Sequence, residues 1–185
     1  MNALSQAIGH LAGSGTPHAL FGAVGLAAYG VLRGTSDIDL LAGHVVISDD
    51  YWLGVRGVRA EVRRGDHTDN LLGCVKIGLA TARRPVDVVV PRGRWVERAL
   101  ARVDSSVVIG HAQVPLLRLE DIVLAKVHSG SRQDVQDILT ACELPDARRD
   151  DIVAHIDAEQ VYLIGPARRD WPRIRRLILT GANPR

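Results

Sequence analysis

The sequence predicts an α/β fold of the α+β type, with a small mixed β-sheet backed by helices and a helical segment after it. Strand-like runs of β-branched residues are concentrated in the first half of the 185 residues, and helical periodicity dominates the second half. Clusters of glycine and proline separate these runs, as turns do. The length suits one domain, or one domain with a small appendage.

The first half is expected to alternate short helices and strands. A first helix carries apolar residues at Leu4, Ile8 and Leu11, with Asn2 as its N-cap. A small Ala- and Leu-rich helix is expected at 23–30, and residues 48–50 can cap a short helix that ends at Val55. The segment 45–47 fits either a helix or a strand. Strands are expected at residues 18–21, 37–42, 58–63, 74–79 and 86–90.

The second half is expected to be largely helical. Trp95 begins the apolar face of a helix. A short strand at 107–109, followed by Val114, interrupts the helical part of the chain. We assign residues 1–115 to the sheet-containing core and residues 116–185 to a helical segment packed on it. The later helices are expected at residues 119–128, 134–142, 150–156 and 171–179.

Composition narrows the class of protein. Hydrophobic residues make up 46% and charged residues 24%, as in soluble globular proteins, and the net charge of +2 permits a nucleotide or nucleic-acid partner without requiring one. Cys74 and Cys142 are far apart and form no metal-type pair, which favours a reducing cytoplasm. The longest apolar stretch, 19–32, is too short to span a bilayer, so no membrane partner is expected.

Two carboxylates stand one residue apart in the strand-like segment 36–40. Alternate side chains of a strand share a face, so Asp37 and Asp39 are expected to point the same way, with Ile38 and Leu40 in the core. Neighbouring carboxylates repel each other unless a cation lies between them. The pair therefore indicates a divalent metal site, for Mg²⁺ or Mn²⁺, although exposed strand faces also carry such pairs.

Two further features support this site. Gly22-Ala23 lies where a strand is expected to turn into a helix, and there a glycine lets a phosphate approach the backbone and the N–H groups of the helix start. Asp87 is the single acid in a valine-rich strand, where a charge is costly unless it is paired or metal-bound. If this strand lies beside that of Asp39, three carboxylates converge, as in-line phosphoryl or nucleotidyl transfer requires. The alternative is an ion pair of Asp87 with Arg83, Arg84 or Arg92.

Together these motifs resemble the signature of the DNA polymerase β-type nucleotidyltransferase superfamily. The matching segments are 20–23, 37–40 and 86–88. The match extends, toward small prokaryotic members related to AbiEii-type abortive-infection toxins, through Gly30, Arg33 and Thr35 and through a helix with Lys126 that precedes Asp134 and Asp137. The resemblance covers roughly residues 19–137.

The resemblance implies roles for these residues. Asp37 and Asp39 would bind the metals that bridge a triphosphate, and Asp87 would hold the catalytic metal and assist deprotonation of the acceptor. Gly22 and Ala23 would cradle the phosphates. Lys126 would contact phosphate or be a lysine at the edge of an apolar face, and Arg33 would contact phosphate or pair with an aspartate. For Asp134 and Asp137 we expect pairing with Arg33, Arg132 or Lys126, and for His128 a surface or capping position.

The implied function is metal-dependent transfer of a nucleoside monophosphate from an NTP to an acceptor hydroxyl on an RNA 3′ end, a protein or a small molecule. A toxin role with a cognate antitoxin or other partner protein is a further implication of the family. One alternative is a catalytically inactive nucleotide- or partner-binding module, because Ala23 stands where the family has Gly or Ser. The other is nucleic-acid binding through the basic residues of segment 168–176, for which a solvated helix face is the simpler interpretation.

Overall fold

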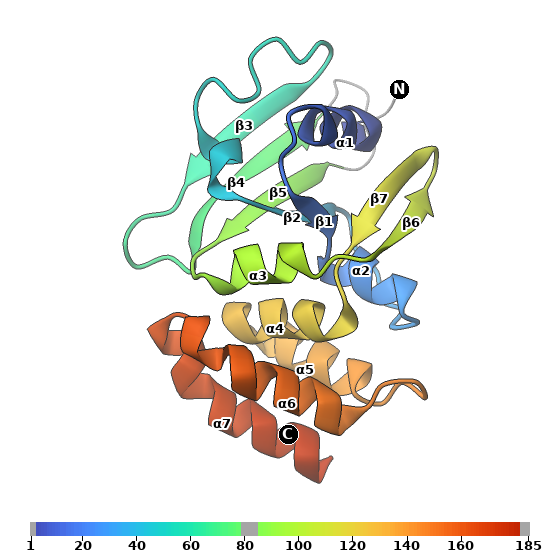
Figure 1. Ribbon diagram of the computed structural model, residues 1–185, viewed down its shortest axis with the longest axis vertical. Coiled ribbons are helices and arrows are strands. Elements are labelled where there is room, and N and C mark those ends of the chain that lie inside the picture. Colours follow the sequence, from blue (N-terminus) through green and yellow to red (C-terminus); the bar gives the residue numbers. More distant parts are fainter. Residues whose placement is uncertain (1–2, 79–84, 182–185) are drawn as a thin grey trace.

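A computed structural model describes residues 3–78 and 85–181 of the protein (Figure 1). Asn2, Leu79, Arg83 and Arg84, which entered the predictions above, lie outside these ranges. No helix within the described ranges is both long enough and apolar enough to cross a membrane.

Seven strands and seven α-helices make up the described chain, confirming the predicted fold class. The strands are β1 (His18–Leu20), β2 (Ile38–Ala42), β3 (Arg59–Arg64), β4 (Leu71–Gly78), β5 (Val86–Pro91), β6 (Ser105–Ile109) and β7 (Ala112–Leu116). The helices are α1 (Ala3–Gly13), α2 (Gly22–Ala28), α3 (Trp95–Ala101), α4 (Leu119–Ser129), α5 (Arg132–Ala141), α6 (Arg149–Glu159) and α7 (Gly165–Thr180). Two 3-10 helices, η1 (His44–Ile47) and η2 (Gln160–Tyr162), complete them.

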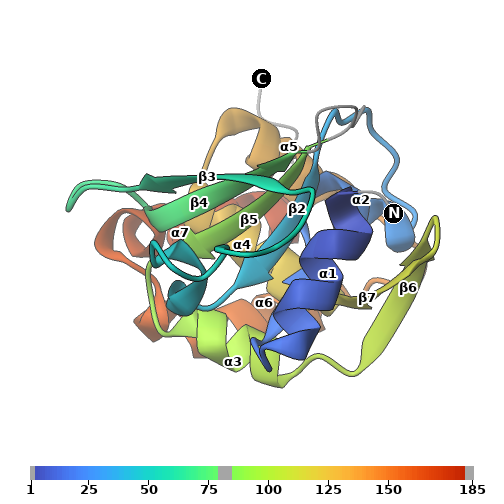
Figure 2. The same cartoon turned by 90° about the horizontal axis from the view of Figure 1, so that it is seen from above.

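All seven strands form one mixed sheet in the order β3-β4-β5-β2-β1-β7-β6. β2 lies near its centre, antiparallel to β1 and parallel to β5. β3 and β4 extend the sheet beyond β5 as an antiparallel pair, and β3 is an edge strand (Figure 2). The expected strand at 86–90 thus lies directly beside the expected strand at 37–42.

The later helices form a second layer. In Figure 1, α4 to α7 occupy the half of the molecule away from β3, with α3 between them and the sheet. α4 packs against α2, α5, α6 and α7 and so joins the two halves, and a single apolar core runs through both. Trp95 and Trp171 are among the largest fully buried side chains.

Three sequence predictions are wrong in detail. Residues 48–55 form turns, with Gly54 at a φ of +80°, and the indole of Trp52 donates to the carbonyl of Val46 at 2.8 Å. Val114 lies in a full strand, because a turn at Gly110 pairs β6 with β7. α7 begins six residues before the expected Trp171 and continues through Pro172.

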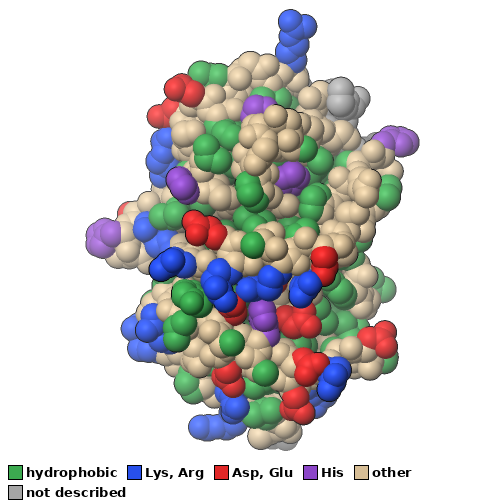
Figure 3. Space-filling view, in the orientation of Figure 1, with side chains coloured by type: hydrophobic (Ala, Val, Ile, Leu, Met, Phe, Trp, Pro, Cys, Tyr) green, Lys and Arg blue, Asp and Glu red, His purple; other side chains and the backbone are tan. Residues whose placement is uncertain are grey.

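A buried ion network joins α3 to α4 and α6. Arg102, which follows α3, donates to Asp121 of α4 at 2.6 Å and to Glu159 of α6 at 2.9 Å. His155 contacts the same Asp121 oxygen as Arg102 at 2.9 Å. Figure 3 shows a row of basic side chains with acidic ones around it across the middle of this face, at the level where Figure 1 places α3. Burial opposes ionisation of Asp121, but the hydrogen bonds from His155 and Arg102 hold its pKa below the usual value.

We expect Asp121→Ala to lower the free energy of unfolding by about 2–3 kcal/mol, because it removes the buried acceptor that Arg102 and His155 share and leaves Arg102 paired with Glu159 alone. Urea unfolding followed by circular dichroism measures this. Asp104→Ala is the matched control, since Asp104 also pairs with an arginine, Arg118, but at the surface. The Asp104→Ala control is expected to change the free energy of unfolding little, because an ion pair at the surface contributes little to stability. Equal losses for both variants would contradict a structural role for the network.

Candidate functional site

Asp39 and Asp87 lie side by side at the centre of the sheet. They are register partners on the parallel strands β2 and β5, so their side chains leave the same face. Ile38 and Leu40 point to the opposite face and are buried, as the alternation predicted. The expectation that the Asp87 strand neighbours the Asp39 strand is therefore confirmed.

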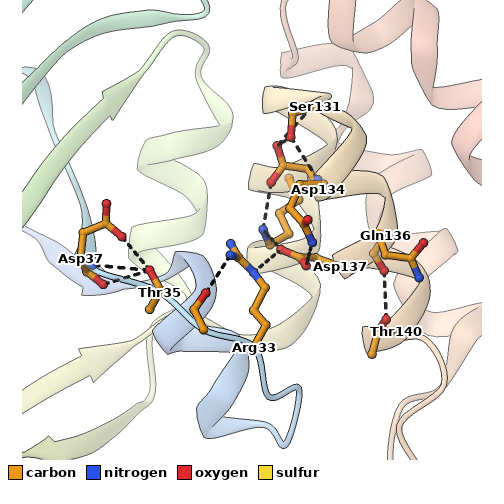
Figure 4. Close-up of polar contacts among 11 residues, drawn as sticks. Arg33, Thr35, Asp37, Ser131, Asp134, Gln136, Asp137 and Thr140 are labelled. Carbon is orange, nitrogen blue, oxygen red and sulfur yellow. Dashed lines mark hydrogen bonds and ion pairs between the residues drawn. The ribbon is translucent and has the colours of Figure 1, made fainter.

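Asp37 sits one residue before β2, and a neighbouring side chain holds it. The hydroxyl of Thr35 donates to Oδ1 of Asp37 at 2.6 Å (Figure 4). This contact gives a physical reason for a threonine two residues before the first acid. It orients one carboxylate oxygen and leaves Oδ2 without a protein donor in the described chain.

Gly22 closes over Asp39 at the start of α2. Its φ is +63°, and a Cβ added there would lie 2.1 Å from Oδ2 of Asp39. The backbone N–H of Phe21 also donates to the carbonyl of Asp39 at 3.1 Å. Only glycine fits this position, because it combines a left-handed conformation with contact against a carboxylate. Ala23, the next residue, is buried.

Burial and neighbouring carboxylates disfavour the charged forms of Asp39 and Asp87. Burial, followed by the charges of Asp37 and Asp87, raises the pKa of Asp39 to about 6, against the lowering effects of Lys126 and Arg33. Burial also raises the pKa of Asp87, although Lys76 opposes the shift. Such mutual destabilisation of charge is relieved by a cation.

Asp87 has one engaged and one free oxygen. Its Oδ2 lies 3.9 Å from the ammonium of Lys76, its register partner on β4, while its Oδ1 is buried without a hydrogen-bond partner in the described residues. Arg92, an alternative partner considered above, instead donates to the backbone carbonyls of Asp66 and Asp69. Asp87 is thus paired by a lysine that the sequence did not single out.

These residues meet part of what a divalent metal needs. Asp37, Asp39 and Asp87 supply carboxylate oxygens, which are the ligands that Mg²⁺ and Mn²⁺ prefer, and Oδ1 of Asp87 is an acceptor with no hydrogen-bond partner among the described residues. However, within residues 3–78 and 85–181 no group of three or more His, Cys, Asp or Glu side chains is placed so that it could hold an ion. A bound metal would therefore require small side-chain rearrangements.

Aspartates of α5 hold the two predicted phosphate-binding cations, and Figure 4 shows Arg33 against Asp137. Lys126 is 5% exposed, and its ammonium donates to Asp134 at 2.9 Å and to Asp137 at 2.6 Å. Arg33 pairs with Asp137 at 3.0 Å. The expected pairing of both aspartates is confirmed, whereas a lysine extending along the edge of an apolar face is not what the structure has. Phosphate contact by Lys126 or Arg33 stays a prediction.

Two residues near the site differ from expectation. His128 is buried rather than at the surface. Its Nε2 lies 2.8 Å from the carbonyl of Asn70, its ring packs on Trp95, and burial lowers its pKa. Lys76 was missed, although its position between Val75 and Ile77 marks it as the outward residue of an alternating strand.

Comparisons with known proteins place the fold. The chain matches no protein-family model and no curated protein. Among solved structures it resembles the solution structure of the antibiotic-resistance factor ANT(2'')-Ia, with a TM-score of 0.53 and 15% identity over 86% of this chain and 90% of that one.

Further similar structures have lower scores. A crystal structure of ANT(2'')-Ia in complex with adenylyl-2''-tobramycin has a TM-score of 0.44 and 16% identity over 96% of this chain and 95% of that one. An antigenic nucleotidyltransferase-like protein from Paracoccidioides brasiliensis has a TM-score of 0.44 and 16% identity over 94% of this chain and 90% of that one. The first comparison shows that this chain has the fold of ANT(2'')-Ia.

We expect Asp39→Asn to stabilise the metal-free protein at pH 7.5 by roughly 3 kcal/mol and to leave it nearly unchanged at pH 4. The folded protein holds the Asp39 proton up to pH about 6, against an ordinary pKa of 3.8, so its stability falls as the pH rises through this interval. Unfolding by urea in EDTA at several pH values measures the difference. A stabilisation of the same size at pH 4 would contradict the assignment.

We expect Gly22→Ala to destabilise the protein more than Gly15→Ala does. Both glycines have a positive φ, +63° and +66°, so both variants carry a backbone cost of about 1–2 kcal/mol. Only at Gly22 does the added Cβ also meet a side chain, that of Asp39. Thermal unfolding of the two variants measures the excess, and equal losses would show that Asp39 yields freely.

Proposed function

We propose that the protein is a metal-dependent nucleotidyltransferase, which moves a nucleoside monophosphate from an NTP to an acceptor hydroxyl. The observation that carries this proposal is the juxtaposition of Asp39 and Asp87 on parallel strands beneath the Gly22 turn. The fold shared with ANT(2'')-Ia agrees with it. The raised pKa of Asp39 gives the pair a reason to accept a cation.

In this proposal Asp37, Asp39 and Asp87 hold Mg²⁺ or Mn²⁺, which would neutralise the charge of the triphosphate and its leaving group. The backbone at Gly22 and Ala23 accommodates the phosphates. The acceptor oxygen forms a bond to the α-phosphorus as the bond from that phosphorus to the bridging oxygen breaks, and pyrophosphate leaves. Asp87 accepts the hydroxyl proton, a role that suits a carboxylate of raised pKa.

Lys126 and Arg33 lie on the side of the site that faces the helical layer. Both charges already lower the pKa of Asp39, so their fields reach the carboxylates although aspartates of α5 hold them. We assign them to the nucleotide phosphates, which would compete with Asp137 for the same cations. The divalent metal would offset the excess of carboxylate over ammonium and guanidinium around the site.

The identity of the acceptor belongs to this proposal too. ANT(2'')-Ia has been solved with adenylyl-2''-tobramycin, in which an adenylyl group is joined to a small molecule. For this chain, an RNA 3′ end, a protein hydroxyl and a small molecule are the three acceptor classes. A toxin role in an AbiEii-type system with a cognate antitoxin belongs to the first two.

One observation favours a second function, a nucleotide- or partner-binding module without catalysis. Lys76 occupies the space beside Oδ2 of Asp87, and the described side chains offer no ready three-ligand metal group. In this alternative the ammonium of Lys76 substitutes for the cation. Ala23, which lacks the hydroxyl of a serine, points the same way.

The test is transfer of α-³²P-labelled nucleotide from each NTP to total RNA, to the protein itself and to a panel of small hydroxyl compounds, with Mg²⁺ or Mn²⁺. We expect transfer by the unmodified chain and a loss of about 100-fold or more in Asp39→Asn and in Asp37→Asn, because each removes charge stabilisation at the transferring phosphate.

Asp150→Asn is the control, because Asp150 is exposed in the first turn of α6. It should transfer at the unmodified rate. Transfer by Asp39→Asn at the rate of the unmodified chain would contradict the assignment of the site. Saturable NTP binding without transfer under any condition would establish the binding module instead.

A further inference from the structure

The face of the sheet that carries Asp87 continues outward as a row of charges. Lys76 of β4 is the register partner of Asp87, and Glu61 of β3 is the partner of Lys76. Arg59 and Arg63 flank Glu61 at alternate positions of β3, so all of them leave the same face. Neighbouring strands lie about 4.8 Å apart, so this row reaches roughly 10 Å from Asp87 to the sheet edge.

The row is basic and open. It carries three cations, Arg59, Arg63 and Lys76, against the single carboxylate of Glu61. The side chains of Arg63 and Lys76 are 67% and 45% exposed. Glu61 pairs with Arg63 at 2.7 Å, and the next arginine, Arg64, points to the other face and pairs with Asp49. The positive charge therefore faces solvent next to the third carboxylate.

Protection of a sheet edge does not account for the whole row. Charged side chains on an edge strand discourage edge-to-edge pairing, which explains Arg59 and Arg63 on β3. Lys76, however, lies on β4, which has a partner on each side. Both Lys76 and Arg63 also lower the pKa of Asp87, so their charges act on the site itself.

We propose that this face, defined by Arg59, Arg63 and Lys76, binds the acceptor, and that the acceptor is the 3′ end of a single-stranded RNA. The inference rests on the proposed transferase function. At such an end the reactive hydroxyl and the preceding phosphate are contiguous, as Asp87 and Lys76 are on the sheet. The phosphates further from the 3′ end would lie toward Arg63. The same positive charge would repel a polycationic acceptor such as an aminoglycoside.

Binding can be tested without catalysis. Fluorescence anisotropy with a labelled 12-nucleotide oligoribonucleotide, in EDTA and without NTP, measures affinity against salt. We expect Arg59→Gln/Arg63→Gln to weaken binding about 10-fold or more and to flatten the salt slope by about 0.7 for each phosphate that is no longer neutralised. Glu61→Gln should tighten binding, because it releases Arg63 from its only carboxylate partner in the described chain.

Arg173→Gln/Arg176→Gln is the matched control, since both arginines are exposed on α7, far from β3 in Figure 1. It should bind like the unmodified chain. Weaker binding by this variant, or equal competition by polyglutamate and RNA, would overturn the proposal. Transfer to RNA that is indifferent to Arg59 and Arg63 would overturn it while leaving the transferase intact. Binding through Arg59 and Arg63 without transfer to any acceptor would overturn the acceptor role and the transferase together.

Discussion

The repulsion between Asp39 and its two acidic neighbours is the constraint on which the site depends. Three carboxylates in one partly buried space are unfavourable, and the chain maintains them through backbone features rather than through counter-charges alone. Parallel pairing of β2 with β5 sets Asp39 beside Asp87, and the turn at Gly22 closes against Asp39. The core residues on the opposite face supply the packing energy that offsets this cost.

The helical layer contributes through two separate ion networks. The first network is the one nearer the site, and it consists of Lys126, Asp134, Asp137 and Arg33. The second network lies next to α3 and consists of Arg102, Asp121 and Glu159. Each network ties residues from the sheet-containing part of the chain to helices that follow it. The orientation of α4 relative to the carboxylates is therefore specified by directional contacts as well as by apolar packing.

Much of this could be predicted from local pattern. The strand alternation around Ile38 and Leu40 predicted which face the acids use, and the valine run predicted a buried strand for Asp87. What depends on pairing between distant strands could not be predicted. Lys76 becomes significant only when β4 lies against β5, and the Nε2 of the buried His128 donates to the carbonyl of Asn70, which is 58 residues away in the sequence. The last helix was expected to begin at Trp171, but α7 begins at Gly165, and buried residues lie both before Pro172 (Ala167 and Trp171) and after it (Ile174).

The raised pKa of Asp39 would couple the proposed binding of a cation to the release of a proton. Near pH 6 about half of the molecules carry a proton on this carboxyl, so any divalent ion that binds there must displace protons into the solvent. Its apparent affinity then increases with pH up to about 6 and levels off above that value. Under the proposed function, acidification below pH 6 would therefore weaken cation binding.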